Sequence, residues 1–191
     1  MFKDDYEKAK TFTAELLPIL RDALKATEIV SFEDLDNESL PNLFDQHAGI
    51  DAVSIDRRGM RGIALRVQYD TAWDTFTIRT KRASGTKTEL AKRIEAIQKG
   101  YIYPYLTCQC YCDRNHKLLS GAVCRTEDLY KYIVEHEEEL GNKARHCPEG
   151  NEFYWVGFDT IEEQCKLLRL KSFSSQPPDR RFFVDTETRK Q

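Results

Sequence analysis

An acidic, a basic and an amide side chain occur in a short segment that is predicted to form two adjacent strands. Asp51 begins one apolar run, and Arg66 and Gln68 belong to the next run, beyond the turn-forming residues 57–60. Alternate residues of a strand share a face, so Arg66 and Gln68 are expected on the same side of the sheet. Carboxylates bind hard divalent cations and guanidinium groups bind phosphates, so these residue types suit chemistry on a phosphate.

Three strands and the helix before them must position these side chains. Apolar residues at helical spacing predict a first helix over 5–25, with a kink or break at Pro18. Runs rich in Val, Ile, Phe and Thr predict strands at 50–56, 61–69 and 75–80. We interpret the three strands as a meander.

A second helix is expected from Thr86 to Gly100. Thr86 and Glu89 have the spacing of a capping box, in which each side chain satisfies a free amide of the other residue. Glu89 and Arg93 are four residues apart in the order that favours an ion pair. This helix therefore has a defined start and a charged exposed face.

The rest of the chain predicts further strands at 105–112, 117–124 and 152–158, and a helix at 126–140. The predicted fold class is α/β (α+β), with a mixed central sheet and a C-terminal helix-strand extension.

A length of 191 residues indicates one globular domain, over 1–171, and residues 172–191 are expected to form a flexible or docking tail. Hydrophobic residues make up 40% and charged residues 32%, which is typical of globular proteins rather than disordered ones. The charged N-terminal segment has neither the apolar core of a signal peptide nor the length of a membrane span. The expected location is the cytoplasm, without a membrane partner.

A cationic stretch begins within the third predicted strand. Arg79, Lys81, Arg82 and Lys87 occur where acidic residues are few, although the whole chain has a formal net charge of −3. Phosphate backbones are held by clusters of this kind. The alternative interpretation is a solvated surface, which is the usual setting of basic residues on helices.

The order of helix, three strands, helix and strand, together with the segments Gly49-Ile50-Asp51 and Ala64-Leu65-Arg66, resembles the restriction-endonuclease-like, or PD-(D/E)XK, nucleases. The resemblance covers about residues 5–112, and the nuclease-like core is expected to extend to about 124. In that family, an aspartate at a strand start and a Glu-x-Lys or Gln-x-Lys on the next strand hold a divalent cation.

The resemblance implies that Asp51 is the ligand of Mg²⁺ or Mn²⁺, and that Asp51, Arg66 and Gln68 form the catalytic site. It also implies that DNA or RNA is the partner, with a basic patch to hold it. The expected nucleic-acid-binding residues are Arg79, Lys81, Arg82 and Lys87.

The motif departs from the family pattern at two positions. Ala64 has no metal-binding group, and Arg66 stays protonated and so cannot accept a proton. One alternative is that Gln68, Asp45 or Glu38 supplies the missing oxygen, and another is that the chain binds nucleic acid without cutting it. A third is purely structural, with Asp51 capping a strand and Arg66 and Gln68 on its surface.

The sequence therefore favours a nucleic-acid-associated, nuclease-like protein with an altered site for metal-dependent phosphodiester hydrolysis. The rival hypothesis is a non-catalytic interaction protein on the same scaffold, such as a phage or mobile-element inhibitor or accessory factor. In that case an acidic surface such as Glu135–Glu139 would face a protein partner.

Cys108, Cys110 and Cys112 alternate along one predicted strand. Thiols on one strand face are about 7 Å apart per step, whereas a zinc knuckle needs two thiols on a tight turn. Without an export signal, buried free thiols are expected rather than zinc ligands or disulfides.

Overall fold

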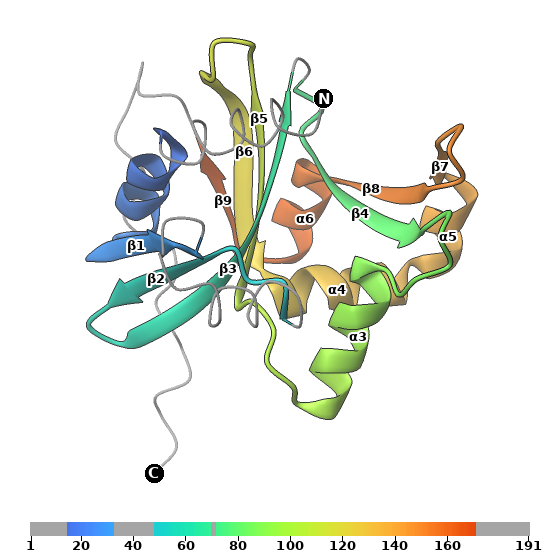
Figure 1. Cartoon of the computed structure of the whole chain (residues 1–191), viewed down its shortest axis with the longest axis horizontal. Coiled ribbons are helices and arrows are strands. Elements are labelled where there is room, and N and C mark those ends of the chain that lie inside the picture. Colours follow the sequence, from blue (N-terminus) through green and yellow to red (C-terminus); the bar gives the residue numbers. More distant parts are fainter. Residues whose placement is uncertain (1–14, 33–47, 70–71, 171–191) are drawn as a thin grey trace.

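The computed structural model describes residues 15–32, 48–69 and 72–170, which form two sheets and the helices packed on them (Figure 1). The larger sheet has six strands in the order β1-β2-β3-β5-β6-β9. They span Glu28–Ser31, Ala52–Asp56, Gly59–Tyr69, Leu106–Cys112, Leu118–Arg125 and Leu167–Leu170, respectively. The smaller sheet has the order β4-β8-β7, spanning Thr75–Lys81, Glu152–Gly157 and Arg145–His146.

The larger sheet is mixed, because β3 and β5 are parallel whereas its other neighbouring strands are antiparallel. Parallel neighbours need a long connection between them. Here that connection contains β4 and the helix α3 (Glu89–Lys99). The predicted α+β class with a mixed central sheet is therefore confirmed.

The third predicted strand is present as β4, but it pairs with β8 rather than with β3. Both edges of β3 are already taken, one by β2 and the other by β5. The edge of β4 instead meets side chains of the larger sheet, where the Tyr111 hydroxyl donates to the Thr75 carbonyl oxygen over 2.8 Å. A meander of three adjacent strands is therefore not formed. The predicted strands and helix over 50–112 follow one another along the chain in the expected order, as β2, β3, β4, α3 and β5, but β1 before them was not predicted.

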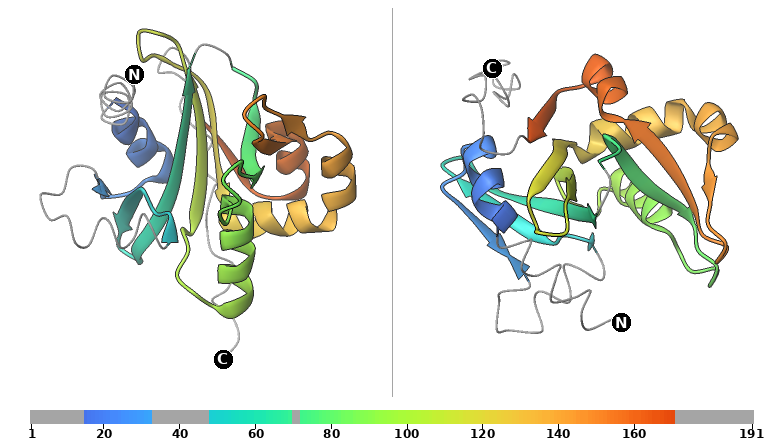
Figure 2. Two further views of the ribbon diagram at one scale, coloured as in Figure 1. Left: turned by 45° about the vertical axis from the view of Figure 1, so that its right-hand side comes forward. Right: turned by 90° about the horizontal axis from the view of Figure 1, so that it is seen from above.

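Helical residues 15–24 lie on one side of the larger sheet and the smaller sheet lies on the other (Figure 2). A hydrophobic core fills each side. On one face, the helical residues 15–24 bring Leu16 and Leu20 against Ile63 and the thiols of β5. The other face packs against the smaller sheet, α4 (Thr126–Glu135) and α6 (Phe158–Gln164).

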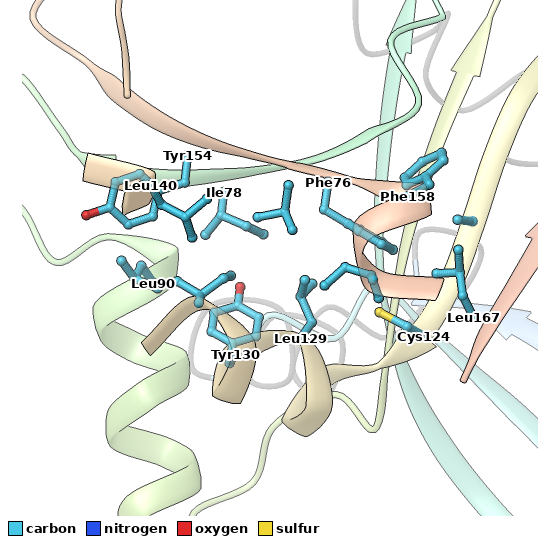
Figure 3. Close-up of a cluster of buried hydrophobic side chains, with 14 of the residues drawn as sticks. Phe76, Ile78, Leu90, Cys124, Leu129, Tyr130, Leu140, Tyr154, Phe158 and Leu167 are labelled. Atoms are coloured by element: carbon cyan, nitrogen blue, oxygen red, sulfur yellow. The ribbon is translucent and has the colours of Figure 1, made fainter. Parts of the chain in front are cut away.

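Figure 3 shows this second core, in which Phe76 and Phe158 meet edge to face with ring centroids 4.9 Å apart. The smaller sheet is therefore anchored by aromatic burial on one face and leaves its other face outside the core.

Helix boundaries differ from the prediction at two places. Helix α3 is capped by Thr88, whose hydroxyl accepts from the Ala91 amide over 3.3 Å, rather than by Thr86. Its end is as expected, because Gly100 adopts the left-handed conformation with φ of 66°. The predicted helix at 126–140 is divided at His136 into α4 and α5 (Glu137–Asn142).

The alternating cysteines of β5 lie buried in the first core as free thiols, as expected. Their spacing differs from the expected step of about 7 Å, because the Sγ atoms of Cys108 and Cys110 are 3.6 Å apart. Among the described residues, no helix is long and apolar enough to cross a membrane. The expected tail at 172–191 and residues 5–14 of the first predicted helix lie outside the described residues.

Candidate functional site

A cavity of about 260 Å³ opens between the larger sheet, the edge of β4, the helix α3 and the segment that precedes β2. The charged and hydrogen-bonding residues of its wall come from several elements that are far apart in the sequence. These residues are Asp51, Arg66, Thr77, Arg82, Glu89, Lys92, Arg93, Thr107 and Gln109. Asp51 and Arg66, two of the predicted catalytic residues, thus line one cavity, whereas Gln68 is not among its lining residues.

Asp51 joins the start of β2 to β3. Its backbone amide donates to the Ile63 carbonyl over 2.9 Å, and its carboxylate Oδ2 accepts from the Leu65 amide over 2.6 Å. The regular β2–β3 register begins only at Ala52 and Ile63, so the carboxylate satisfies an amide that β2 does not reach. Asp51 therefore has the strand-capping role of the structural interpretation and also faces the cavity.

Arg66 bridges β3, β4 and α3. Its Nη1 donates to the Thr77 carbonyl oxygen and lies 3.8 Å from Glu89 Oε2. The other carboxylate oxygen of Glu89 accepts from the buried Tyr130 hydroxyl over 3.1 Å. The guanidinium of Arg66 is therefore fixed at the cavity wall by a carbonyl and a carboxylate.

Arg93 is buried, although the sequence suggested an exposed partner of Glu89. Its guanidinium donates to the carbonyl oxygens of Ala48 and Gly49, the second over 2.7 Å. Gly49 has a φ of 57°, and a Cβ there would lie 2.7 Å from Arg93 Nη2. Glycine is required at this close approach, and Arg93 holds the segment that carries Asp51 against α3.

The predicted basic patch is divided between the cavity and the surface. Arg82 lines the cavity, whereas Lys81 pairs with Glu152 over 2.9 Å outside it. Lys87 pairs with Glu95 on the exposed side of α3. The residues that line the cavity do not include Arg79, Lys81 or Lys87.

Lys92 and Arg93 add two cations to the cavity that were not among the predicted nucleic-acid-binding residues. Basic residues at these positions of an amphipathic helix are explained equally well by ion pairs on its surface. The helical periodicity therefore could not predict that Lys92 and Arg93 line a cavity.

The cavity wall carries four cationic side chains, Arg66, Arg82, Lys92 and Arg93, against two carboxylates, Asp51 and Glu89, which is a formal net charge of +2. The same electrostatic field acts on Arg79. Burial lowers the pKa of the Arg79 guanidinium, and the positive charges of Arg66 and Arg82 lower it further. An anion bound among these groups would reduce their mutual repulsion.

Two buried polar groups in the wall have unused hydrogen-bonding capacity. Gln109 accepts from the Thr77 amide over 3.5 Å through Oε1, whereas its Nε2 has no hydrogen-bond partner in the described part of the chain. The Thr77 hydroxyl likewise has none there. Both side chains are more than nine-tenths buried. A buried donor without an acceptor lowers the stability of the folded protein, so each of these donors favours an acceptor in the cavity.

The donor set does not make a complete metal site. Within 15–32, 48–69 and 72–170, no three His, Cys, Asp or Glu side chains are grouped so that they could hold an ion. Asp51 Oδ2 and both oxygens of Glu89 already contact protein groups. Asp45 and Glu38, the other predicted sources of an oxygen, lie outside the described residues.

Comparisons with models of protein families, with curated proteins and with solved structures find no match for this chain.

Proposed function

We propose that this protein binds the phosphate backbone of nucleic acid in the cavity between β3, β5, the edge of β4 and α3. The observation that carries the proposal is the formal charge of +2 on a cavity wall that also contains buried, unpartnered hydrogen-bond donors. Anionic oxygens are the acceptors that such a wall favours, because charge-assisted hydrogen bonds are stronger than neutral ones.

Each part of the wall has a distinct role in this proposal. Arg82 and Lys92 supply charge, and Arg66, fixed by Thr77 and Glu89, supplies a directed guanidinium. Gln109 and Thr77 supply donors at the buried side of the cavity. Phosphate contacts of this kind give affinity without sequence specificity.

The nuclease-like relationship is supported by Asp51 and Arg66, which share the cavity as the resemblance implies. A divalent ion would have Asp51 as its protein ligand, and Mg²⁺ commonly uses one or two carboxylates together with substrate phosphates. The described donors do not complete a site by themselves, so we propose binding as the function and derive no hydrolytic step.

The alternative of a protein-binding module has one supporting feature. Glu137, Glu138 and Glu139 crowd the first turn of α5, and all three are exposed. Only Glu139 has an ion pair among the described residues, with Lys143. A protein partner with a basic surface is the expected ligand if nucleic acid is not bound.

Replacing Lys92 or Arg82 with alanine is expected to weaken binding of DNA and RNA of any sequence. Each lost phosphate contact should reduce the slope of log affinity against log salt by about one. Fluorescence anisotropy of labelled single-stranded DNA, duplex DNA and RNA, titrated at several salt concentrations, measures both quantities. Lys131→Ala is the matched control, because Lys131 is an exposed lysine on α4 outside the cavity.

An equal loss of affinity in Lys131→Ala would show a nonspecific charge effect and contradict the cavity. Absence of nucleic-acid binding by the unmodified protein would favour the protein-binding alternative. The same titrations with Mg²⁺ or Mn²⁺ test Asp51, since an ion-dependent gain in affinity or cleavage that Asp51→Asn abolishes would identify it as a metal ligand.

A further inference from the structure

The smaller sheet has one face that the hydrophobic core does not use. Phe76, Ile78, Tyr154 and Val156 project into the second core. Successive residues of a strand point to opposite faces, so the residues between them form the other face. In the register of β4 and β8, Thr77 lies opposite Trp155, and Arg79 lies opposite Phe153.

Aromatic rings and arginines cover this outer face. The Trp73 and Trp155 rings lie 4.2 Å apart at 35°. The Arg145 guanidinium carbon lies 4.2 Å from the centroid of Trp155 and 4.9 Å from that of Trp73. We call Trp73, Phe153 and Trp155, with Arg79 and Arg145, the aromatic platform.

Part of the platform is open to solvent. Trp73 remains 40% exposed despite its contacts, and Arg145 is exposed and makes no ion pair among the described residues. The nearby carboxylate of Glu152 is neutralised by Lys81. An exposed indole beside an unpaired guanidinium offers both a stacking surface and a positive charge.

The platform adjoins the cation-lined cavity. Thr77 lines the cavity and is the cross-strand neighbour of Trp155. Arg79 packs over Phe153, with its guanidinium carbon 5.3 Å from the ring centroid, and its charge interacts with those of Arg66 and Arg82. A strand whose phosphate occupies the cavity can therefore continue across β4 and β8.

We propose that the aromatic platform stacks the bases of a single-stranded nucleic acid whose phosphates bind in the cavity. This inference rests on the proposed function. Stacking on aromatic side chains tolerates any sequence, and arginine adds a cation–π contribution. Bases of a duplex are already stacked on each other, so the platform gives a preference for single strands.

Intrinsic fluorescence tests the platform directly, because both tryptophans of the chain, Trp73 and Trp155, belong to it. Unmodified protein is titrated with single-stranded DNA, single-stranded RNA and duplex DNA of matched length. Quenching by the single strands, with little quenching by the duplex, is the expected result. The two single-stranded arms also distinguish DNA from RNA.

A variant series supplies the second measurement. Trp73→Ala should weaken single-strand binding by at least about fivefold, the lower end of what one stacked base contributes, and leave duplex binding unchanged. Trp73→Phe should restore most of the affinity. Met60→Ala is the control, since Met60 is also an exposed apolar residue but lies in the β2–β3 hairpin, across the molecule from β7 and β8 (Figure 1).

The outcomes separate this inference from the function on which it rests. Binding of single strands and duplex with equal affinity, without quenching and without an effect of Trp73→Ala, would overturn the platform and leave the cavity proposal standing. Binding that Arg82→Ala weakens for both forms, but Trp73→Ala for single strands alone, supports both. Absence of any binding overturns both.

Discussion

Arg93 illustrates how one side chain can decide whether a site exists. Its hydrogen bonds to the carbonyl oxygens of Ala48 and Gly49 place the segment before β2 against α3. Asp51 lies two residues beyond Gly49 and lines one side of the cavity. The site therefore depends on a buried guanidinium that has no contact with a ligand in our proposal.

Arg93→Met should lower the free energy of unfolding by about 2–3 kcal/mol, because the buried carbonyls of the 48–49 segment lose their charged donor. Urea denaturation followed by circular dichroism measures the change. The matched control is Gln98→Met, which alters an exposed residue of the same helix and is expected to change stability by less than about 0.5 kcal/mol. Similar losses in both variants would mean that Arg93 does not have this bracing role.

The start of helix α3 is set by the hydrogen bonds of two nearby threonines, Thr86 and Thr88. The capping-box spacing pointed to Thr86, yet the Thr86 hydroxyl lies 2.9 Å from that of Ser84 within the preceding loop. Thr88 has the extended conformation of a capping residue, and its hydroxyl accepts from Ala91. Glu89 is thereby placed in the first turn, where it meets Arg66 rather than the cap.

Thr88→Ala is expected to destabilise the protein by about 1 kcal/mol, the usual effect of removing a capping hydroxyl. Thr86→Ala makes the same chemical change two residues earlier and should lower the free energy of unfolding by clearly less. Thermal and urea unfolding of the two variants, compared with the unmodified protein, would establish which threonine caps α3. A larger destabilisation by Thr86→Ala than by Thr88→Ala would contradict this and support the capping box that the sequence suggests.

Buried thiols and phenols in both cores determine how the whole molecule responds to alkaline pH. Burial raises the pKa of the Cys110, Cys124 and Tyr130 side chains well above their ordinary values. Burial, with a smaller effect of Cys112, raises the pKa of Tyr69 to about 12. The unfolded chain releases these protons at lower pH than the folded protein, so deprotonation favours unfolding.

The stability associated with these groups should be fully present below about pH 8.5, the ordinary pKa of a thiol, and should be lost as the pH rises above it. Urea denaturation at several pH values between about 7 and 11 measures the decline. Cys124→Ala should make the decline shallower, whereas Cys147→Ala, at a half-buried position, leaves the buried thiols in place as a control. A stability that is independent of pH over this range would contradict the prediction.

Much of the secondary structure was accessible from the sequence, because it depends on neighbouring residues. The alternating and β-branched runs that predicted strands at 50–56, 61–69 and 152–158 correspond to β2, β3 and β8 within a few residues. Gly100 likewise marked the end of α3, since the left-handed conformation favours glycine. These features follow from local backbone preference and from the side-chain period of each element.

The pairing of strands, and the contacts between side chains of distant strands, could be seen only in the tertiary structure. Pairing of β4 with β8 joins segments about 75 residues apart. The pairing of β4 with β3 that a meander needs is excluded, because β2 and β5 occupy both edges of β3. Gln109 lies beside Arg66 in the cavity because β5 is the parallel neighbour of β3. Trp155 lies beside Trp73 because β8 pairs with β4, which follows Trp73.

The sequence by itself determined the α+β class, most of the elements and the two residues Asp51 and Arg66 that share the cavity. The tertiary structure decided which cations surround them and which aromatic residues gather beside them. The physical reason is that the first set depends on periodicity over a few residues, whereas the second depends on contacts that only the packing of distant segments creates.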